Sequence, residues 1–259
     1  MKLYLAPLEG ITSYIYRKAL YQCFDGFDKY FIPFIRAKQN LNFSGREKKD
    51  ISLENNSGMY AVPQILSRNA DDFLRTANQL KEYGYQEVNL NLGCPSKTVV
   101  TKGCGAGFLT RPDELEQFLD RIFSKTDMKI SVKTRLGMED AEEFPRLMEI
   151  YNRFPMEELI IHPRVQKDFY KNIPNLEIFG EALAISKNSV CYNGDIFSAD
   201  DFKRIHAQFP NVECFMMGRG ILADPSLARE IRGGKAADQS DIRRFHDLLY
   251  HTYREEVSG

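Results

Sequence analysis

Eight short runs rich in β-branched and aromatic residues alternate with longer stretches of helical periodicity, and this alternation constrains the fold most. Repeated strand–helix units predict a parallel sheet, because each helical crossover returns the chain to the same end of the sheet. Eight units in 259 residues predict an α/β protein of the (β/α)8 TIM-barrel class, with an open doubly wound sheet as the alternative. The expected strands are Lys2–Ala6, Tyr30–Phe34, Ala61–Leu66, Glu87–Leu92, Lys129–Arg135, Glu158–His162, Ser189–Asn193 and Glu213–Met217.

The stretches between the strands are mostly amphipathic. Ala70–Tyr83 and Pro112–Phe123 carry apolar residues at helical spacing and are expected to be outer helices. Arg36–Gly58 is polar and has little periodicity, which predicts a long loop after the second strand. Long loops often carry functional residues.

The last part of the chain departs from the strand–helix alternation. A Gly-Gly-Lys-Ala-Ala-Asp run follows Arg232 and has the composition of a hinge, and Ser240–Glu256 has the periodicity of one helix. We therefore expect a barrel domain over residues 1–232 and a short extension, a hinge plus a helix, over residues 233–259.

Charge and cysteine content exclude several classes of protein. Lys and Arg number 35 against 36 Asp and Glu, so the chain is not a polycation that binds nucleic acid by bulk attraction. Five scattered cysteines without a Cys-x-x-Cys pair argue against a disulfide framework, a zinc ribbon or an iron–sulfur cluster. Pro7 and Glu9 interrupt the first apolar run too early for a signal peptide, and no run approaches the ~20 apolar residues of a membrane span. These features predict a monomeric cytoplasmic protein with neither a metal nor a membrane partner.

Polar residues gather where the expected strands end, which is where barrel enzymes place their active sites. Lys133 lies in an apolar strand, where a charge is costly unless an anion or acceptor meets it. Met217-Gly218-Arg219-Gly220 ends the last strand, and its glycines and cation predict a phosphate cradle, although a tight loop has the same composition.

The sharpest motif, Asn91-Leu92-Gly93-Cys94-Pro95, ends the fourth expected strand. Other motifs along the chain are Ala6-Pro7-Leu8-Glu9-Gly10-Ile11-Thr12, Val62-Pro63-Gln64, Lys102-Gly103-Cys104-Gly105-Ala106-Gly107, Val132-Lys133-Thr134-Arg135-Leu136-Gly137, Ile161-His162-Pro163-Arg164, Asn193-Gly194-Asp195-Ile196 and Met217-Gly218-Arg219-Gly220. Together and in this order they resemble the motifs of the tRNA-dihydrouridine synthase family of flavoenzymes, over nearly the whole chain.

The resemblance implies an FMN-dependent barrel that reduces the C5–C6 double bond of particular uridines in tRNA, with NADPH as electron donor. Cys94 falls on the family's catalytic acid and Asn91 on a contact to the uracil edge. Arg164 and Tyr170 fall near positions that face the substrate base. The positions expected to contact FMN are Pro7, Leu8, Gln64, Lys133, His162, Asn193, Asp195, Gly218 and Arg219.

These residue types suit the chemistry on physical grounds. When flavin N5 delivers hydride to C6 of uracil, C5 needs a proton, and a thiol with a pKa near ~8.5 is mostly protonated at neutral pH. A lysine near the flavin's pyrimidine edge stabilises negative charge on the reduced ring, and an amide matches an imide edge. The plainer alternatives are a small buried cysteine, an exposed edge lysine and a core histidine.

A tRNA enzyme must also hold phosphates, and the charges of this chain are unevenly placed. The expected strand-end loops carry a basic rim of Arg36, Lys38, Arg46, Lys48, Lys49, Lys97, Lys102, Arg135, Arg164, Lys167, Lys171 and Arg219. Many acidic residues fall on the expected helices instead. A basic rim around the active-site mouth would attract RNA, although some of these charges could be merely solvated.

The chain departs from the family where a helical domain that grips tRNA is expected after the barrel. We interpret residues 233–259 as a truncated remnant of that domain. Pro163 in place of the family's glycine and Leu8 in place of methionine are smaller departures near the flavin pocket. Two alternative functions remain at this point: an FMN-dependent reductase of a free pyrimidine or another activated alkene, and a non-catalytic RNA-binding barrel.

Overall fold

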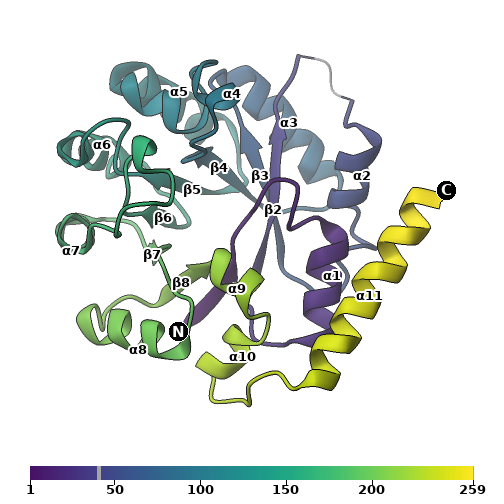
Figure 1. The fold of residues 1–259 in the computed structure, drawn as a ribbon. Coiled ribbons are helices and arrows are strands. Elements are labelled where there is room, and N and C mark those ends of the chain that lie inside the picture. Colours follow the sequence, from purple (N-terminus) through teal and green to yellow (C-terminus); the bar gives the residue numbers. More distant parts are fainter. Residues whose placement is uncertain (40–41, 259) are drawn as a thin grey trace.

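In the computed structural model, which describes residues 1–39 and 42–258, eight parallel strands close into a barrel in sequence order (Figure 1). The closed barrel confirms the TIM-barrel prediction and excludes the open sheet. All eight expected strands are present, and their bounds differ from the expected ones by at most two residues. They are β1 (Lys2–Leu5), β2 (Lys29–Arg36), β3 (Ala61–Leu66), β4 (Glu87–Leu92), β5 (Lys129–Arg135), β6 (Leu159–His162), β7 (Val190–Tyr192) and β8 (Cys214–Met217).

Helices surround the strands, and their caps explain where several of them begin. Asn69, Asn175 and Ser198 each accept a hydrogen bond from the backbone amide three residues on, at the starts of α3, α7 and α8. The helices are α1 (Tyr14–Cys23), α2 (Gly45–Ile51), α3 (Ala70–Glu82), α4 (Lys97–Val100), α5 (Pro112–Lys125), α6 (Phe144–Tyr151), α7 (Leu176–Ile185), α8 (Ala199–Gln208), α9 (Arg219–Ala223), α10 (Leu227–Ile231) and α11 (Gln239–Ser258). Short 3-10 turns cover Gly105–Thr110, Ala141–Glu143 and Gln166–Asp168.

The strand side chains alternate between two cores. In β4, Val88, Leu90 and Leu92 belong to the larger core between the strands and the helices. Alternate residues of a strand point to opposite faces, so Asn89 and Asn91 point into the barrel. The apolar part of the barrel interior consists of Tyr4, Ala6, Phe31, Val62, Ile160, Cys191, Cys214 and Met216.

A buried ionic cluster closes the amino-terminal end of the barrel. Lys29 Nζ lies 2.9 Å from Glu87 and 3.0 Å from Glu158, and Tyr4 donates a hydrogen bond to Glu158. Burial opposes the charge on Lys29, but the two carboxylates together raise its pKa above the ordinary value. The loss of Lys29 would leave two acids without their cation inside the barrel, so this end is a structural floor.

The expectation of a structureless loop over Arg36–Gly58 is wrong, because α2 lies within it. The Ser44 side chain accepts from the Glu47 amide, and the Glu47 carboxylate accepts from the Ser44 amide, which is a capping box. The Ser-x-x-Glu spacing was therefore a usable signal in this polar stretch. Residues 40–41 of the expected loop lie outside the described residues.

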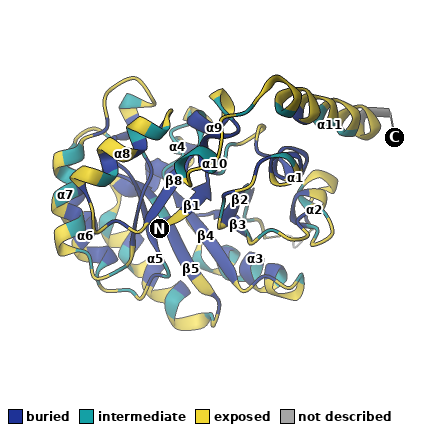
Figure 2. Cartoon of the chain, turned by 90° about the horizontal axis from the view of Figure 1, so that it is seen from below, coloured by how far each residue is buried: buried dark blue, intermediate teal, exposed yellow. Residues whose placement is uncertain are grey.

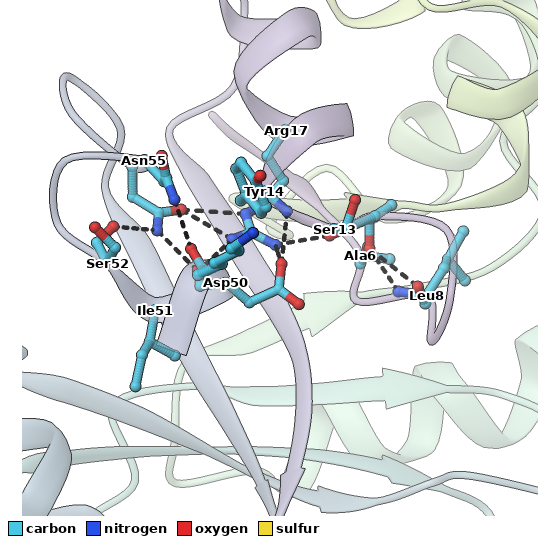
Figure 3. Close-up of polar contacts among 12 residues, drawn as sticks. Ala6, Leu8, Ser13, Tyr14, Arg17, Asp50, Ile51, Ser52 and Asn55 are labelled. Atoms are coloured by element: carbon cyan, nitrogen blue, oxygen red, sulfur yellow. Dashed lines mark hydrogen bonds and ion pairs between the residues drawn. The ribbon is translucent and has the colours of Figure 1, made fainter. Parts of the chain in front are cut away.

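Arg17, which is fully buried in α1, ties α2 to the loop between β1 and α1 (Figure 3). Its guanidinium donates to the carbonyls of Thr12 and Asp50, both at 2.7 Å, and to Oδ1 of Asn56 at 3.0 Å. The Tyr14 amide donates to Oδ1 of Asp50 at 2.6 Å. These bonds fix the segment between β1 and α1, which follows the carboxyl end of β1.

The C-terminal helix α11, expected over Ser240–Glu256, lies along α1 on the outside of the barrel (Figure 1). Phe245 packs edge-on against Tyr16 of α1 and against Phe24, the residue that ends α1. Most of the remaining helix is exposed to solvent (Figure 2). The helix is therefore attached to the barrel along one narrow face.

Candidate active site

A pocket of about 480 Å³ opens at the carboxyl ends of the strands, as expected for a barrel enzyme. Residues from the ends of β1 through β6 and β8 converge on it. Its walls are formed by Pro7, Leu8, Glu9, Ile11, Phe34, Gln64, Asn91, Gly93, Cys94, Pro95, Ser96, Lys133, Arg135, His162, Phe169, Tyr170, Arg219 and Leu222.

The thiol of Cys94 lies on this wall in a loop held by the side chain of Asn91. Oδ1 of Asn91 accepts hydrogen bonds from the amides of Gly93 and Cys94, at 3.1 and 2.9 Å. The Ala106 amide donates to the Cys94 carbonyl at 3.1 Å. A side chain at Gly105 would lie 3.0 Å from Cβ of Cys94, and its φ of +56° also favours glycine. The loop is thus fixed on both sides of the thiol.

Burial raises the pKa of the Cys94 thiol above its ordinary value, and a hydrogen bond with the Ser96 backbone, together with the charges of Arg36 and Arg135, only partly offsets this effect. The thiol therefore stays protonated at neutral pH. A protonated thiol at a pocket wall is a proton donor rather than a nucleophile.

A chain of hydrogen-bonded side chains links Asn91 to the floor of the barrel. Nδ2 of Asn91 donates to Gln64 at 2.7 Å, and Gln64 donates in turn to Asn89 at 2.7 Å. Asn89 donates to the hydroxyl of Ser131 at 3.0 Å, and Ser131 donates to Glu87 at 3.1 Å. Because the final acceptor is a carboxylate, which only accepts, the chain fixes the orientation of each amide. Gln64 and Asn91 therefore present defined edges to the pocket.

Lys133 projects from β5 into the same pocket and makes no salt bridge with the described residues. Burial, with Arg135 as the next cause, lowers the pKa of Lys133 to about 7. An anionic group in the pocket would restore its charge, so this position is built to meet negative charge.

His162, at the end of β6, is a neutral imidazole. Burial first, and then the surrounding cations, lower its pKa well below the ordinary value. Arg164 Nη1 lies 3.1 Å from Nε2 of His162. Since a guanidinium can only donate, Nε2 accepts this bond and the ring proton is on Nδ1. The Tyr170 ring stacks on His162 with a centroid distance of 6.0 Å.

Asp195, which lines a narrow extension of the pocket, holds two guanidinium groups. Its carboxylate accepts from Arg164 at 2.9 and 2.5 Å, in a bidentate pair, and also from Arg219. The Arg219 guanidinium then lies between two rings, 4.6 Å from the centroid of Tyr170 and 5.3 Å from that of Phe197. Asp195 therefore fixes the direction of Arg219 and compensates the buried charge of Arg164.

Arg135 joins the Cys94 loop to the loop after β6. It is 1% exposed, and it donates to the carbonyls of Gly93, Val165 and Phe169 at 2.9, 2.9 and 2.8 Å. Phe169 has a φ of +50°, which costs a non-glycine residue about 1–3 kcal/mol. The bond from Arg135 holds this strained turn, which places Tyr170 at the pocket.

A narrower extension of about 70 Å³ continues the pocket toward β7 and β8. Three glycines line it, and Gly218 is so close to β1 that a Cβ there would lie 3.3 Å from Cβ of Ala6. Asn193 anchors the first of these loops by donating to the Met216 carbonyl at 2.8 Å. Backbone approach and a cation at one end suit a phosphate.

A comparison with protein-family models matches residues 4–256 to dihydrouridine synthase (Dus). The chain belongs to this family. Among curated dihydrouridine synthases, the tRNA-dihydrouridine(16) synthase of Ralstonia nicotianae is 27% identical over 93% of this chain and 75% of the relative. The tRNA-dihydrouridine(16) synthase of Cupriavidus necator is 29% identical over 92% of this chain and 76% of the relative. The tRNA-dihydrouridine synthase B of Pasteurella multocida is 27% identical over 88% and 68%.

Solved structures outside the dihydrouridine synthases share the barrel. Morphinone reductase superposes with a TM-score of 0.65 at 10% identity, covering 94% of this chain and 90% of the other. The old yellow enzyme homologue from Zymomonas mobilis has a TM-score of 0.64 at 10% identity, covering 93% and 91%. At these identities the likeness concerns the fold.

Most of the site residues expected of a dihydrouridine synthase lie together. The main pocket and its extension share six of them: Pro7, Leu8, Lys133, His162, Tyr170 and Arg219. Gln64, Asn91 and Cys94 line the main pocket alone, and Asn193, Asp195 and Gly218 line the extension. Arg164 lines neither and is 2% exposed, so it lies behind the wall, where it contacts Asp195 and His162.

Two features of the pocket of this dihydrouridine synthase differ from what its sequence predicts. Arg135 and Arg164 were expected in an exposed basic rim, which is wrong because both are buried. The apolar wall of Ile11, Phe34 and Leu222 was not expected either. Phe34 ends the expected second strand, and that position at the mouth of a barrel was the available signal.

The pocket fits the flavin that the fold and family imply. Glycines and Arg219 line the extension, whereas the main pocket presents apolar side chains together with the amides of Gln64 and Asn91, and Lys133 lines both. In the described part of this dihydrouridine synthase, no helix is long and apolar enough to cross a membrane. Among the same residues no cluster of three or more His, Cys, Asp or Glu side chains is arranged to hold a metal ion.

Proposed function

We propose that the protein reduces the C5–C6 double bond of specific uridines in tRNA to dihydrouridine, using FMN and taking electrons from NADPH. The observation that carries the proposal is the protonated thiol of Cys94 on the wall of a pocket that also presents Lys133 and oriented amides. Family membership supports the same reaction.

The proposed flavin contacts divide along the pocket. Gly218 and Arg219 bind the phosphate at the narrow end, where Asn193 and Asp195 hold the two loops in place. Pro7 and Leu8 supply the apolar wall near this end. The ring contacts are Gln64, Lys133 and His162.

Each ring contact has a distinct electrostatic role. Lys133 regains its proton next to the negative charge of reduced flavin and stabilises that charge. His162, neutral with its proton on Nδ1, is a hydrogen-bond donor. Gln64 is held in one orientation by Asn89, so its contact with the ring needs no reorganisation. Bound FMN supplies the hydride, from N5 to C6 of the uracil.

The thiol of Cys94 completes the reduction by donating its proton to C5 of the same base. Hydride and proton together add the two hydrogens of dihydrouridine, and Cys94 is left as a thiolate that solvent reprotonates. Asn91 holds the Cys94 loop and meets the uracil edge. Tyr170 faces the base from the β6 side. Arg164 positions His162 and Asp195 rather than touching the substrate.

We also propose the division into a catalytic barrel, residues 1–232, and an extension of a hinge and one helix, residues 233–259. The exposed surface of α11 and its narrow contact with α1 support a separate role for the extension. The proposal places a monomeric enzyme in the cytoplasm together with its tRNA substrate.

The direct test uses the purified protein, FMN, NADPH and unmodified tRNA, with nucleoside mass spectrometry as the readout. We expect dihydrouridine at defined positions of tRNA and no turnover of free uracil. Turnover of free uracil without modification of tRNA would identify a free-pyrimidine reductase instead. A protein that binds RNA but retains no flavin would be a non-catalytic RNA-binding barrel.

A further inference from the structure

A second, larger groove lies beside the active-site pocket, at the same end of the barrel. Its volume is about 770 Å³, and it runs between the segments that follow β2, β3 and α4. Its lining residues are Arg36, Ala37, Lys38, Leu66, Ser67, Arg68, Asn69, Asp72, Lys102 and Cys104. Nothing in the proposed reduction uses this groove.

The groove is strongly cationic. Four of its residues, Arg36, Lys38, Arg68 and Lys102, carry positive charge, and none of them makes an ion pair with residues 1–39 or 42–258. The one acidic residue, Asp72, is paired with Arg75 of its own helix. Lys38, Arg68 and Lys102 are exposed to solvent. Unpaired cations gathered in a concave surface attract a polyanion.

The Cys94 loop separates this groove from the active-site pocket. Cys94 lines the pocket and Cys104 lines the groove. Arg36 is close enough to both thiols to oppose the rise in pKa that burial causes at each. Gly105, which follows Cys104, is so close to Cys94 that a Cβ there would lie 3.0 Å from Cβ of Cys94. A chain that lay in the groove would therefore pass next to the segment that packs against Cys94.

The remaining cations of the expected basic rim are less well placed to bind an RNA backbone. Arg135 and Arg164 are buried, Arg219 is paired with Asp195, and Lys49 is paired with Glu256. The other exposed cations of the expected rim line neither the pocket nor the groove; they are Arg46, Lys48, Lys97, Lys167 and Lys171. Among these surfaces, the groove lined by Cys104 combines a concave shape with several unpaired positive charges.

We propose that this groove binds the phosphate backbone of the single-stranded RNA next to the target uridine. The inference rests on the proposed function, because it assumes an RNA substrate. A base that enters the pocket must leave its stack, and the flanking backbone must then be held by contacts that do not depend on sequence. In this proposal Arg68 and Lys102 contact successive phosphates, and Arg36 and Lys38 add positive charge to the same groove.

The test compares two double variants that each remove two exposed, unpaired cations. Arg68→Gln/Lys102→Gln removes two of the four positive charges of the groove, whereas the control Lys125→Gln/Lys187→Gln alters residues that precede strands at the opposite end of the barrel. Binding of unmodified tRNA is measured by filter retention over a range of salt concentrations. Flavin content and flavin reduction by NADPH monitor the integrity of the pocket in each variant.

We expect the groove variant to bind tRNA about tenfold more weakly, and its slope of log affinity against log salt to fall by about 1.4, since each phosphate on a single strand contributes about 0.7. The control should match the wild type. Equal affinity and slope in the groove variant would overturn the inference and leave the proposed function intact. A raised KM for NADPH with unchanged tRNA binding would assign the groove to the dinucleotide and also overturn it. A wild-type protein that neither binds nor reduces tRNA would overturn both proposals.

Discussion

The backbone amide of Cys94 donates a 2.9 Å hydrogen bond to the side-chain oxygen of Asn91, three residues earlier and still within β4. The proposed proton donor is thus held by the last inward-facing residue of β4. The orientation of the Asn91 side chain is fixed in turn by the hydrogen bond that it donates to Gln64. Position and direction of the thiol are therefore set by the barrel rather than by the loop alone.

Replacing Asn91 with alanine frees two loop amides and should misplace the thiol. Because an error of about 1 Å can cost about 100-fold in rate, we expect a loss of that order in dihydrouridine formation. Flavin reduction by NADPH should persist, since Cys94 and Asn91 do not supply its electrons. Stopped-flow measurement of the two half-reactions checks this. Equal losses in both half-reactions would show that Asn91 acts on the flavin instead.

Asp195→Asn keeps the shape of the side chain but removes the charge that Arg164 and Arg219 share. An unpaired buried guanidinium costs about 3–5 kcal/mol, discounted here because the Asp195 carboxylate is 31% exposed, so we expect a loss of about 2 kcal/mol in the free energy of unfolding. FMN should also bind more weakly, because Arg219 loses its orientation. Denaturant unfolding and flavin titration measure the two effects. Tighter FMN binding would contradict a positioning role for Asp195.

The depressed pKa of Lys133 predicts a pH dependence of stability in the protein without flavin. Its pKa is about 7 in the fold and about 10.4 in the unfolded chain. Between these values the unfolded chain binds more protons, so this group makes the protein more stable as pH rises from 7 to 10. Lys133→Met should lack this part of the rise and should retain less FMN. Parallel unfolding curves for the two proteins across this range would refute the assignment.

The strand positions could be predicted because the direction of each strand side chain, into or out of the barrel, is reflected in the local sequence pattern. β3, β4 and β5 begin and end at the expected residues. Lys133 was notable as a charged residue within an apolar strand, and the role of Cys94 was implied by the motif that ends β4. Pairs such as Arg164 with Asp195 could not be predicted, because they join loops after different strands. The burial of Arg135 depends on three carbonyls from two loops, which no local pattern records.

Helix α2 is a different case, because the sequence motif that indicates it, a capping box, lies within the helix's own first turn. Ser44 and Glu47 form a capping box, yet the helix buries little, with Asp50 and Ile51 as its buried residues. A short helix with so small an apolar face has no visible periodicity. Its position depends instead on the long-range bond between Asp50 and the Tyr14 amide.

The raised pKa of Cys94 predicts how turnover depends on pH. The acid form persists through neutral pH and is lost as pH rises through the raised pKa. Dihydrouridine formation by enzyme with pre-reduced flavin should therefore be level near pH 7 and decline in the alkaline range. A decline that begins below pH 7 would point to a different proton donor.

The most direct test of the account is the single-turnover reaction of Cys94→Ala with unmodified tRNA, measured by nucleoside mass spectrometry after the flavin has been reduced. The account predicts normal flavin content, normal reduction by NADPH, and a loss of dihydrouridine formation of about 100-fold or more. Cys23→Ala, which changes a half-buried thiol at the end of α1 that lines neither the pocket nor the groove, is the matched control. Undiminished dihydrouridine formation by the Cys94→Ala protein would contradict the role of this thiol as the proton donor.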